Sequence, residues 1–321
     1  MESLTTLAEI AYAVIGPIVV LVGAGYLLGR RVPAAAEVLA KVMLYLLVPV
    51  FVFQNLLASS LEGRECGLII LFSALALVVF LAMSWGASRL RRHDPALRGS
   101  FVNSAILYNS ANFAIPVMAL AYGSFDPETA AYAVAIQAIV AACQGFAAYT
   151  VGALIAAGGA GPVRHTMVKA FRLPLIYALA AAMLLLRLGV DAKTLGSVTV
   201  LWKPITLICG AYVPVALMTL GAQMACVRLL GSPVDLGLSL VLRLAAGPLV
   251  GLALVKMMGL GGVLAQVLVI GISGPSAVAT VVLAIEFKNR RADFAASVIF
   301  LSTLAAGLTV PAVIFFVLTY L

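Results

Sequence analysis

Two amides and a proline stand in the middle of a long apolar stretch. The stretch 99–125 has no charged residue, yet it contains Asn109, Asn112 and Pro116. It is long enough to cross a bilayer, whose apolar core of ~30 Å needs about 20 helical residues. At that depth a proline removes a backbone N–H and disfavours the preceding helical turn. The freed polar groups then need partners, so these residue types predict hydrogen bonding to the broken backbone or to a ligand.

A second stretch has the same features. The stretch 257–285 is also uncharged and contains Ser273, Gly274, Pro275 and Ser276. Proline suits the first turn of a helix, so each segment can restart as a half-helix whose N-terminus carries a partial positive charge. Two such ends that meet at the membrane midplane would attract an anion. We therefore predict a substrate site at these two segments.

Three further polar residues lie inside apolar stretches. Gln137 and Gln144 are about two helical turns apart on one face of a helix; they either reach the predicted site or bond between helices. Arg243 lies roughly 12 Å inside its segment. It either extends its side chain to the cytoplasm, which we expect, or pairs with a substrate carboxylate.

An intramembrane enzyme is the alternative from another class. The sequence "GISG" at 271–274 fits the Gly-x-Ser-Gly pattern of rhomboid-like serine proteases. Serine chemistry needs a base within hydrogen-bond reach, and His93 and His165 are expected in solvated basic loops. The four cysteines are scattered without metal-ligand spacing. We expect no catalytic residue, no metal and no cofactor.

The composition places these residues in a membrane. The chain has 321 residues, of which 64% are hydrophobic and only 10% charged, whereas a soluble domain is about a quarter charged. The apolar runs are long and continuous, as in helices, rather than alternating, as in barrel strands. We predict an all-α integral membrane protein with ten transmembrane helices, at 10–29, 42–61, 66–88, 99–125, 129–163, 173–186, 204–227, 236–255, 257–285 and 294–321.

The basic residues predict the orientation. Most of the 20 lysines and arginines fall in the odd-numbered loops, which the positive-inside rule assigns to the cytoplasm. Both termini are then outside, and the expected location is the cell's inner (plasma) membrane. The net charge of +8 expresses this bias and requires no nucleic-acid partner.

The chain divides into two similar halves. The Gly-rich, basic linker 156–168 separates 1–155 from 169–321, each with five predicted helices. An odd number of helices gives the halves opposite orientations. Prolines recur at similar offsets in the two halves, as the pairs Pro17 and Pro174, Pro49 and Pro214, and Pro116 and Pro275. A 5+5 inverted repeat with interrupted helices is typical of transporters.

Four motifs resemble the auxin efflux carrier family. They are "LYLLVPVFVFQNL" (44–56), "NSANFAIPVMALAYG" (109–123), "VPVALMTLGAQMA" (213–225) and "GPSAVATVVLAIEF" (274–287). The plant members of this family export auxin, and its bacterial members are thought to move malate, malonate and similar carboxylates. The short central loop is similar to that of the bacterial members.

The resemblance implies a fold similar to sodium/bile acid symporters, with helices 4 and 9 crossing at their prolines. Helices 1, 2, 6 and 7 would form a scaffold that makes a homodimer, and helices 3–5 and 8–10 a transport domain that moves as an elevator. Asn109, Asn112 and Pro116 match the family's motif in helix 4. Pro275 is matched in helix 9, although the preceding "GISG" departs from an amide pair. The implied function is secondary transport of small organic anions.

The coupling ion is a separate question. Sodium sites use oxygen ligands, usually with carboxylates, and the stretches 99–125 and 257–285 contain neither Asp nor Glu. We therefore expect sodium-independent transport. A sodium-coupled organic anion symporter of the same fold is the alternative.

Overall fold

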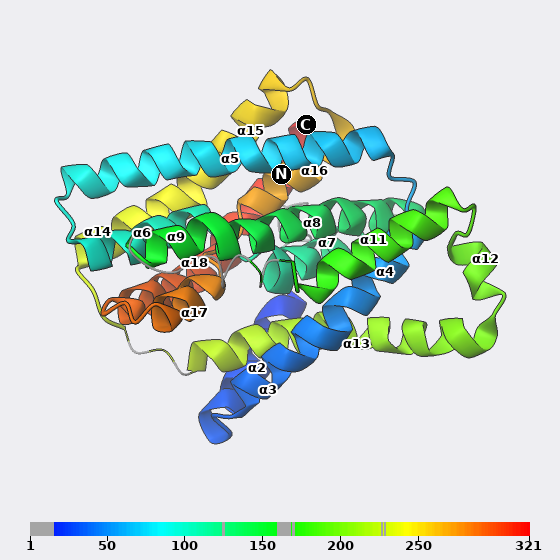
Figure 1. Cartoon of the computed structure of the whole chain (residues 1–321), viewed down its shortest axis with the longest axis horizontal. Coiled ribbons are helices and arrows are strands. Elements are labelled where there is room, and N and C mark those ends of the chain that lie inside the picture. Colours follow the sequence, from blue (N-terminus) through cyan, green and yellow to red (C-terminus); the bar gives the residue numbers. More distant parts are fainter. Residues whose placement is uncertain (1–15, 124–125, 159–167, 169–170, 226, 228) are drawn as a thin grey trace, which may run out of the picture. The chain divides into compact units, whose positions relative to one another are not determined.

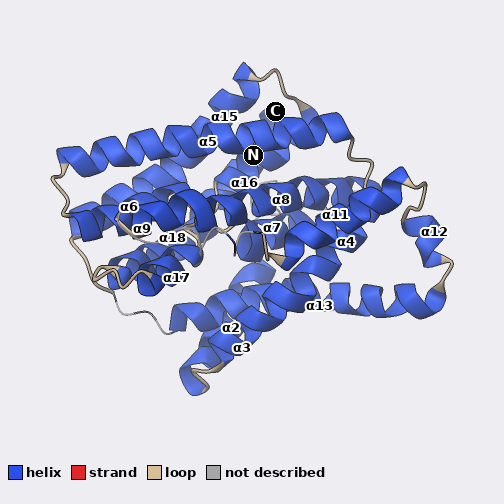
Figure 2. Cartoon of the chain, in the orientation of Figure 1, coloured by secondary structure: helices blue, strands red, loops and turns tan. Residues whose placement is uncertain are grey.

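The chain is helical throughout its described part. The structure, a computed structural model, describes residues 16–321 except 124–125, 159–167, 169–170, 226 and 228. No strand occurs among these residues (Figure 2). Six of the described helices are long and apolar enough to cross a bilayer. These findings confirm the predicted all-helical class and agree with an integral membrane protein. Most of the predicted linker, 159–167, and the start of the first predicted helix lie outside the described residues.

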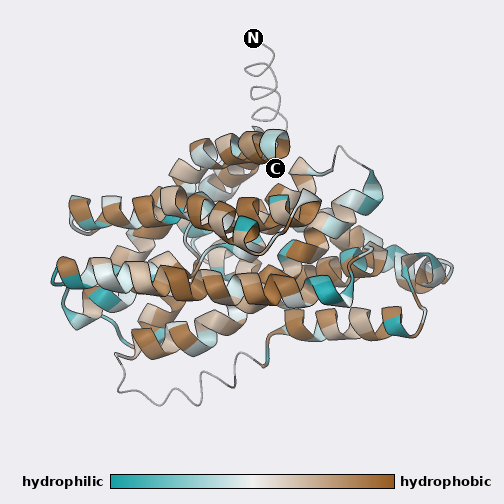
Figure 3. Cartoon of the chain, turned by 90° about the horizontal axis from the view of Figure 1, so that it is seen from above, coloured by the Kyte–Doolittle hydropathy of each residue, from teal (hydrophilic) through white to brown (hydrophobic). Residues whose placement is uncertain are grey.

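The six long helical stretches coincide with uncharged or nearly uncharged runs, and hydrophilic residues gather mainly near helix ends (Figure 3). They are Ala35–Ala58, Gly63–Leu90, Pro127–Ala156, Thr199–Ala225, Pro233–Met257 and Ala292–Tyr320. Three of them contain a π-helical turn, at Met43–Leu47, Ala148–Gly152 and Val241–Ala245. Prolines occupy the first position of several helices, where the missing N–H costs nothing.

The described contacts group the chain into two compact units. Unit 1 comprises 1–68, 111–142 and 173–226, and unit 2 comprises 69–110, 143–172 and 227–321. The helices α5 (Gly63–Leu90) and α8 (Pro127–Ala147) each begin in unit 1 and continue in unit 2.

In unit 1, α2 (Gly16–Arg31) packs along α13 (Thr199–Ala225) through glycines (Figure 1). A Cβ atom on Gly25 would lie 2.1 Å from the carbonyl oxygen of Met218, and one on Gly221 would lie 1.9 Å from that of Val22. Both distances are far below van der Waals contact, so only glycine permits this approach of the two backbones.

The helix α4 (Val48–Ala58) links α13 to a further helix of unit 1. It contacts both α13 and α11 (Pro174–Arg187). The ring of Phe51 stacks on that of Tyr212 at 4.1 Å between centroids. The Tyr212 hydroxyl donates to the carbonyl of Ala111 at 2.9 Å, which ties α13 to the chain just before α7 (Ile115–Ala121).

In unit 2, α6 (Pro95–Ile106) packs against α9 (Ala153–Ala156), α17 (Ala279–Glu286) and α18 (Ala292–Tyr320). The helix α16 (Gly262–Ile272) packs against α18 and α15 (Ala246–Met257), which continues α14 (Pro233–Leu240) through the π-helical turn η5 (Val241–Ala245). All these elements frame the two interrupted segments.

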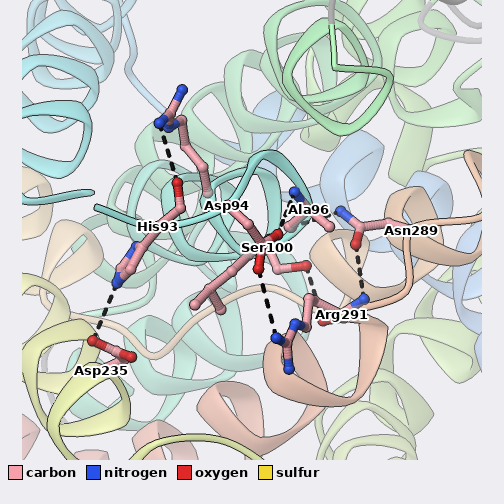
Figure 4. A network of polar contacts seen from close by, with 9 residues as sticks. His93, Asp94, Ala96, Ser100, Asp235, Asn289 and Arg291 are labelled. Atoms are coloured by element: carbon pink, nitrogen blue, oxygen red, sulfur yellow. Dashed lines mark hydrogen bonds and ion pairs between the residues drawn. The ribbon is translucent and has the colours of Figure 1, made fainter. Parts of the chain in front are cut away.

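A polar network holds the start of α6 (Figure 4). The Asp94 carboxylate caps the helix by accepting from the N–H groups of Ala96 and Leu97 at 2.9 and 3.0 Å. The Ser100 hydroxyl donates to the carbonyl of Arg291 at 2.9 Å, and the Asn289 amide donates to that of Ala96 at 3.0 Å. The turn between α17 and α18 is thereby fixed to α6.

The environment of His93 differs from the prediction of a solvated loop. Its side chain is 3% exposed and contacts the Asp235 carboxylate at 3.1 Å, as Figure 4 shows. Arg91 donates to the same carboxylate at 2.9 Å. A buried carboxylate needs such partners, and Asp235 in the first turn of α14 supplies a contact that the local sequence around His93 does not reveal.

Candidate functional site

Both predicted broken helices are interrupted. The helix α6 ends at Ile106, and helical structure resumes at Ser110. Likewise α16 ends at Ile272, and α17 begins at Ala279. Between these ends the chain is extended or bent. Each interruption leaves backbone groups without helical partners inside an apolar segment, where unpaired groups cost several kcal/mol.

The two interruptions pair with each other, and all of their paired residues belong to unit 2. Tyr108 and Ser276 form an antiparallel bridge. The N–H of Asn109 donates to the carbonyl of Pro275 at 2.8 Å, and the N–H of Ala277 donates to that of Leu107 at 2.9 Å. Each break therefore satisfies part of the backbone of the other, through an isolated β-bridge. We call these two segments, 107–109 and 275–277, the crossing.

The crossing does not lie at both prolines. Pro275 is part of it, but the break in the first segment falls at Leu107–Asn109, before Pro116, so the expectation that both helices cross at their prolines is wrong. Pro116 is the second residue of α7, which directly follows the π-helical turn η3 (Ser110–Ala114). A π-helical turn widens the backbone locally, and this accommodates a residue without an N–H.

The serines of the second segment bond to protein backbone. The Ser276 hydroxyl donates to the carbonyl of Ser104 at 2.5 Å, and its N–H donates to the hydroxyl of Ser302 at 3.1 Å. The Ser273 hydroxyl donates to the carbonyl of Val269 at 2.6 Å, within its own helix. Ser273 is therefore held as a helix-terminal residue, while His93 contacts Asp235; neither arrangement favours the serine protease alternative.

Gln144 connects the fifth predicted segment to the crossing. Its side-chain oxygen accepts from the N–H of Tyr108 at 3.2 Å. Nearby, the Asn103 amide donates to the carbonyl of Gly152 at 2.9 Å, so α6 is also tied to η4 (Ala148–Gly152). Gln144 thus reaches the crossing.

The structure brings together six of the nine predicted site residues. Unit 2 contains Asn109, Gln144, Ser273, Gly274, Pro275 and Ser276, and all six are buried. Asn112, Pro116 and Gln137 belong to unit 1. There Gln137 and Pro116 are buried and Asn112 is half-buried.

Arg243 has the most unexpected position. Its side chain is fully buried, so the expectation that it extends to the cytoplasm is wrong. Its two terminal nitrogens donate at 2.5 Å to the carbonyls of Ala105 and Ile272. These carbonyls belong to the last turns of α6 and α16, directly before the two breaks. Arg243 lies in the π-helical turn η5.

Two aromatic rings enclose the Arg243 guanidinium. Its central carbon lies 4.5 Å from the ring centroid of Phe80 and 4.9 Å from that of Tyr108. Sequence reasoning noted the charge but missed both of its roles as a donor. It also missed Tyr108, Ser104 and Ser302, because one tyrosine and single serines within apolar segments give no local signal of a site.

No group of His, Cys, Asp and Glu side chains that could hold a metal ion occurs among the residues that the structure describes. The crossing instead offers backbone dipoles, hydroxyls, amides and one guanidinium. Such groups can bind a ligand through hydrogen bonds and electrostatic attraction.

Comparison with known protein families identifies the family of this chain. A sequence model described as "Membrane transport protein" matches residues 10–164 and again 162–314, and the two matches meet inside the predicted linker 156–168. No curated protein matches the chain. Since the matched residues span nearly all of the sequence, this chain belongs to the membrane transport protein family, which includes the auxin efflux carriers.

Proposed function

We propose that this protein is a secondary transporter of small organic anions. The observation that carries the proposal is the crossing, in which two interrupted helices of a membrane transport protein pair through their backbones. Interrupted helices near the midplane form the substrate sites of many transporters. The helix α17 begins directly after the crossing, and helix N-termini favour anions. Carboxylates, including auxin-like acids and dicarboxylates, are the proposed substrate class.

We further propose that the protein has ten transmembrane helices in two inverted repeats of five, 1–155 and 169–321. The two family matches, which meet at 162–164, support a division at this place. We also propose, from the positions of the basic loops, that both termini lie outside the inner membrane.

The proposed movement is of the elevator type, with a scaffold of helices 1, 2, 6 and 7 in a homodimer and a transport domain of helices 3–5 and 8–10. The grouping of α2, α4, α11 and α13 in one compact unit supports this division. Unit 1 also contains α7 and most of α8, so the proposed transport domain is larger than unit 2.

Transport is proposed to be sodium-independent, because 99–125 and 257–285 contain no acidic residue that could bind sodium with a formal charge. The membrane potential would then act on the substrate alone. A potential of 100 mV is worth about 2.3 kcal/mol per charge. For a monoanion in an inside-negative cell this favours the outside by roughly 50-fold, so export is the expected direction.

The test is uptake of a panel of labelled carboxylates into proteoliposomes of purified protein at a fixed potential. We expect saturable flux of at least one carboxylate, equal in sodium and in choline. Asn109→Ala should lower this flux, because Asn109 lies in the crossing. Asn55→Ala is the matched control, since the Asn55 amide donates within its own helix to the carbonyl of Phe51.

Each alternative has its own outcome. Flux that disappears in choline would replace the proposal by the sodium-coupled symporter. Undiminished flux in well-expressed Asn109→Ala protein would exclude Asn109 from the site. Cleavage of peptides by the purified protein, with no carboxylate flux, would revive the protease alternative.

A further inference from the structure

Arg243 places a positive charge inside unit 2 without a carboxylate beside it. No ion pair of Arg243 occurs among the described residues. Its guanidinium contacts two backbone carbonyls and two aromatic rings. Arginine stays protonated in proteins, so this charge is permanent. A buried charge is costly unless it is well hydrogen-bonded, which indicates that the guanidinium has a role that an apolar residue would not fill.

The two carbonyls that bind Arg243 belong to helix C-termini. The last carbonyls of a helix lack intrahelical partners and carry a partial negative charge. In transporters with discontinuous helices, such C-terminal ends and unwound carbonyls coordinate the coupling cation. In this chain the carbonyls of Ala105 and Ile272 are already occupied by one side chain.

We propose that Arg243 is a built-in cation of the crossing, held where an ion-coupled transporter with broken helices binds its coupling ion. It caps both half-helices and supplies the crossing with a permanent positive charge that complements an anionic substrate. The anion-transport part of this inference rests on the proposed function; the capping part does not. Arg243 is thus a positioning residue that makes a coupling cation unnecessary.

The surroundings are shaped for a guanidinium. Aromatic faces attract cations, and the rings of Phe80 and Tyr108 both lie within 5 Å of its central carbon. A Cβ atom on Gly247 would lie 3.0 Å from the carbonyl oxygen of Ile272 and 3.3 Å from a terminal nitrogen of Arg243. A glycine at this position leaves room for the hydrogen bond between them.

The first experiment separates charge from volume. Arg243→Lys keeps a cation that can donate to the carbonyls, whereas Arg243→Met keeps a similar length without charge. The thermal unfolding midpoint of the purified protein in detergent should be higher for Arg243→Lys than for Arg243→Met. Carboxylate flux should fall about tenfold or more in Arg243→Met, because hydrogen bonds to a charged group are lost. It should fall less in Arg243→Lys. A Met variant as stable and active as Lys would overturn the proposal.

The second experiment fills the vacated space. In Arg243→Ala, millimolar guanidinium should raise the unfolding midpoint, whereas equal urea, which has the same shape without charge, should not. The control is Arg64→Ala, because Arg64 is exposed and its removal leaves no buried space. Equal responses to guanidinium and urea, or no response to guanidinium, would contradict a bound cation.

A third experiment tests whether the protein needs sodium as a coupling cation. Replacement of sodium by choline should leave the wild-type unfolding midpoint and flux unchanged. A midpoint of the substrate-free wild type that rises with sodium but not with choline would show that a separate cation site exists, and would overturn the inference. Since unfolding is measured without substrate, absence of carboxylate flux would count against the proposed function alone.

Discussion

The N–H of Asn109 donates to the carbonyl oxygen of Pro275 across 2.8 Å, so residues from the two halves of the chain complete each other's backbone. Neither break has this partner until the other is in place. The crossing is therefore a cooperative element, and a change on either side should affect both.

Loss of the Gln144 acceptor should destabilise the crossing. Gln144→Leu leaves the buried N–H of Tyr108 without the side-chain oxygen that it now contacts at 3.2 Å. An unsatisfied buried donor costs about 1–3 kcal/mol, so the thermal unfolding midpoint should fall. Gln54→Leu is the control, because the Gln54 side-chain oxygen has no hydrogen-bond partner among the described residues. Equal midpoints for the two variants would refute the assigned role of Gln144.

The glycine contact of α2 with α13 should tolerate no methyl group. Gly221→Ala would place a Cβ atom 1.9 Å from the carbonyl oxygen of Val22, and overpacking of this kind costs about 1–3 kcal/mol or more. Gly23→Ala meets nothing within 4 Å and improves helix propensity by up to about 1 kcal/mol. The midpoint of unfolding should fall in the first variant and hold or rise in the second. A Gly221→Ala protein as stable as wild type would show that the helices can separate at no cost.

The cap of α6 should make stability depend on pH. The pKa of Asp94 lies below its ordinary value of 3.8, foremost because its carboxylate accepts a hydrogen bond from the N–H of Leu97. The N–H of Ala96 and the charge of Arg291 also lower this pKa. A carboxylate whose pKa is lowered by folding stabilises the folded state above its unfolded pKa. This contribution is lost as the pH falls through the lower, folded pKa.

Asp94→Asn isolates that contribution, because asparagine caps a helix without titrating. Wild type should be the more stable protein near neutral pH, and the difference between the two midpoints should shrink on acidification below about pH 4. A difference that stays constant across this range would mean that the Asp94 charge contributes nothing. Added salt should reduce the part of this stability difference that is due to the ion pair of Asp94 with Arg291, since both side chains are exposed.

The orientation can be tested with single cysteines in a background without native thiols. Asp126→Cys should react with an impermeant thiol reagent in intact cells, and Leu90→Cys, beside the basic turn after α5, should react only after permeabilisation. Both positions are exposed, so a lack of reaction reports the side of the membrane rather than burial. Labelling of the position 90 cysteine in intact cells would reverse the proposed topology.

The sequence was sufficient to predict the class of the fold and the existence of two breaks. The long uncharged runs gave the helices, and Pro275 with its small neighbours marked the second break directly. Both are local signals. The polar residues Asn109 and Ser276 were predicted to lie near the breaks, and the structure places both at the crossing. Gln144, for which the sequence left two alternatives open, also contacts the crossing.

The position of the first break was not predictable from local sequence. No proline or glycine occurs at Leu107–Asn109, and Pro116, which marks a break by its chemistry, lies in the first turn of α7, directly after a π-helical turn. The break is fixed by the segment around Pro275, far along the chain. For the same reason Arg243 was expected to reach the cytoplasm. Its two carbonyl acceptors, at the ends of α6 and α16, come within reach of one side chain only in the folded protein.

The π-helical turn Ser110–Ala114 has a consequence for insertions and deletions. Such a turn holds one residue more than the corresponding α-helical turn. Removal of one residue from it would leave an ordinary α-helical turn and keep the flanking residues nearly in phase, whereas removal of one residue from α7 would rotate all that follows by about 100°. A gap within 110–114 in an alignment therefore preserves the faces of the residues that follow, and a gap within α7 changes them.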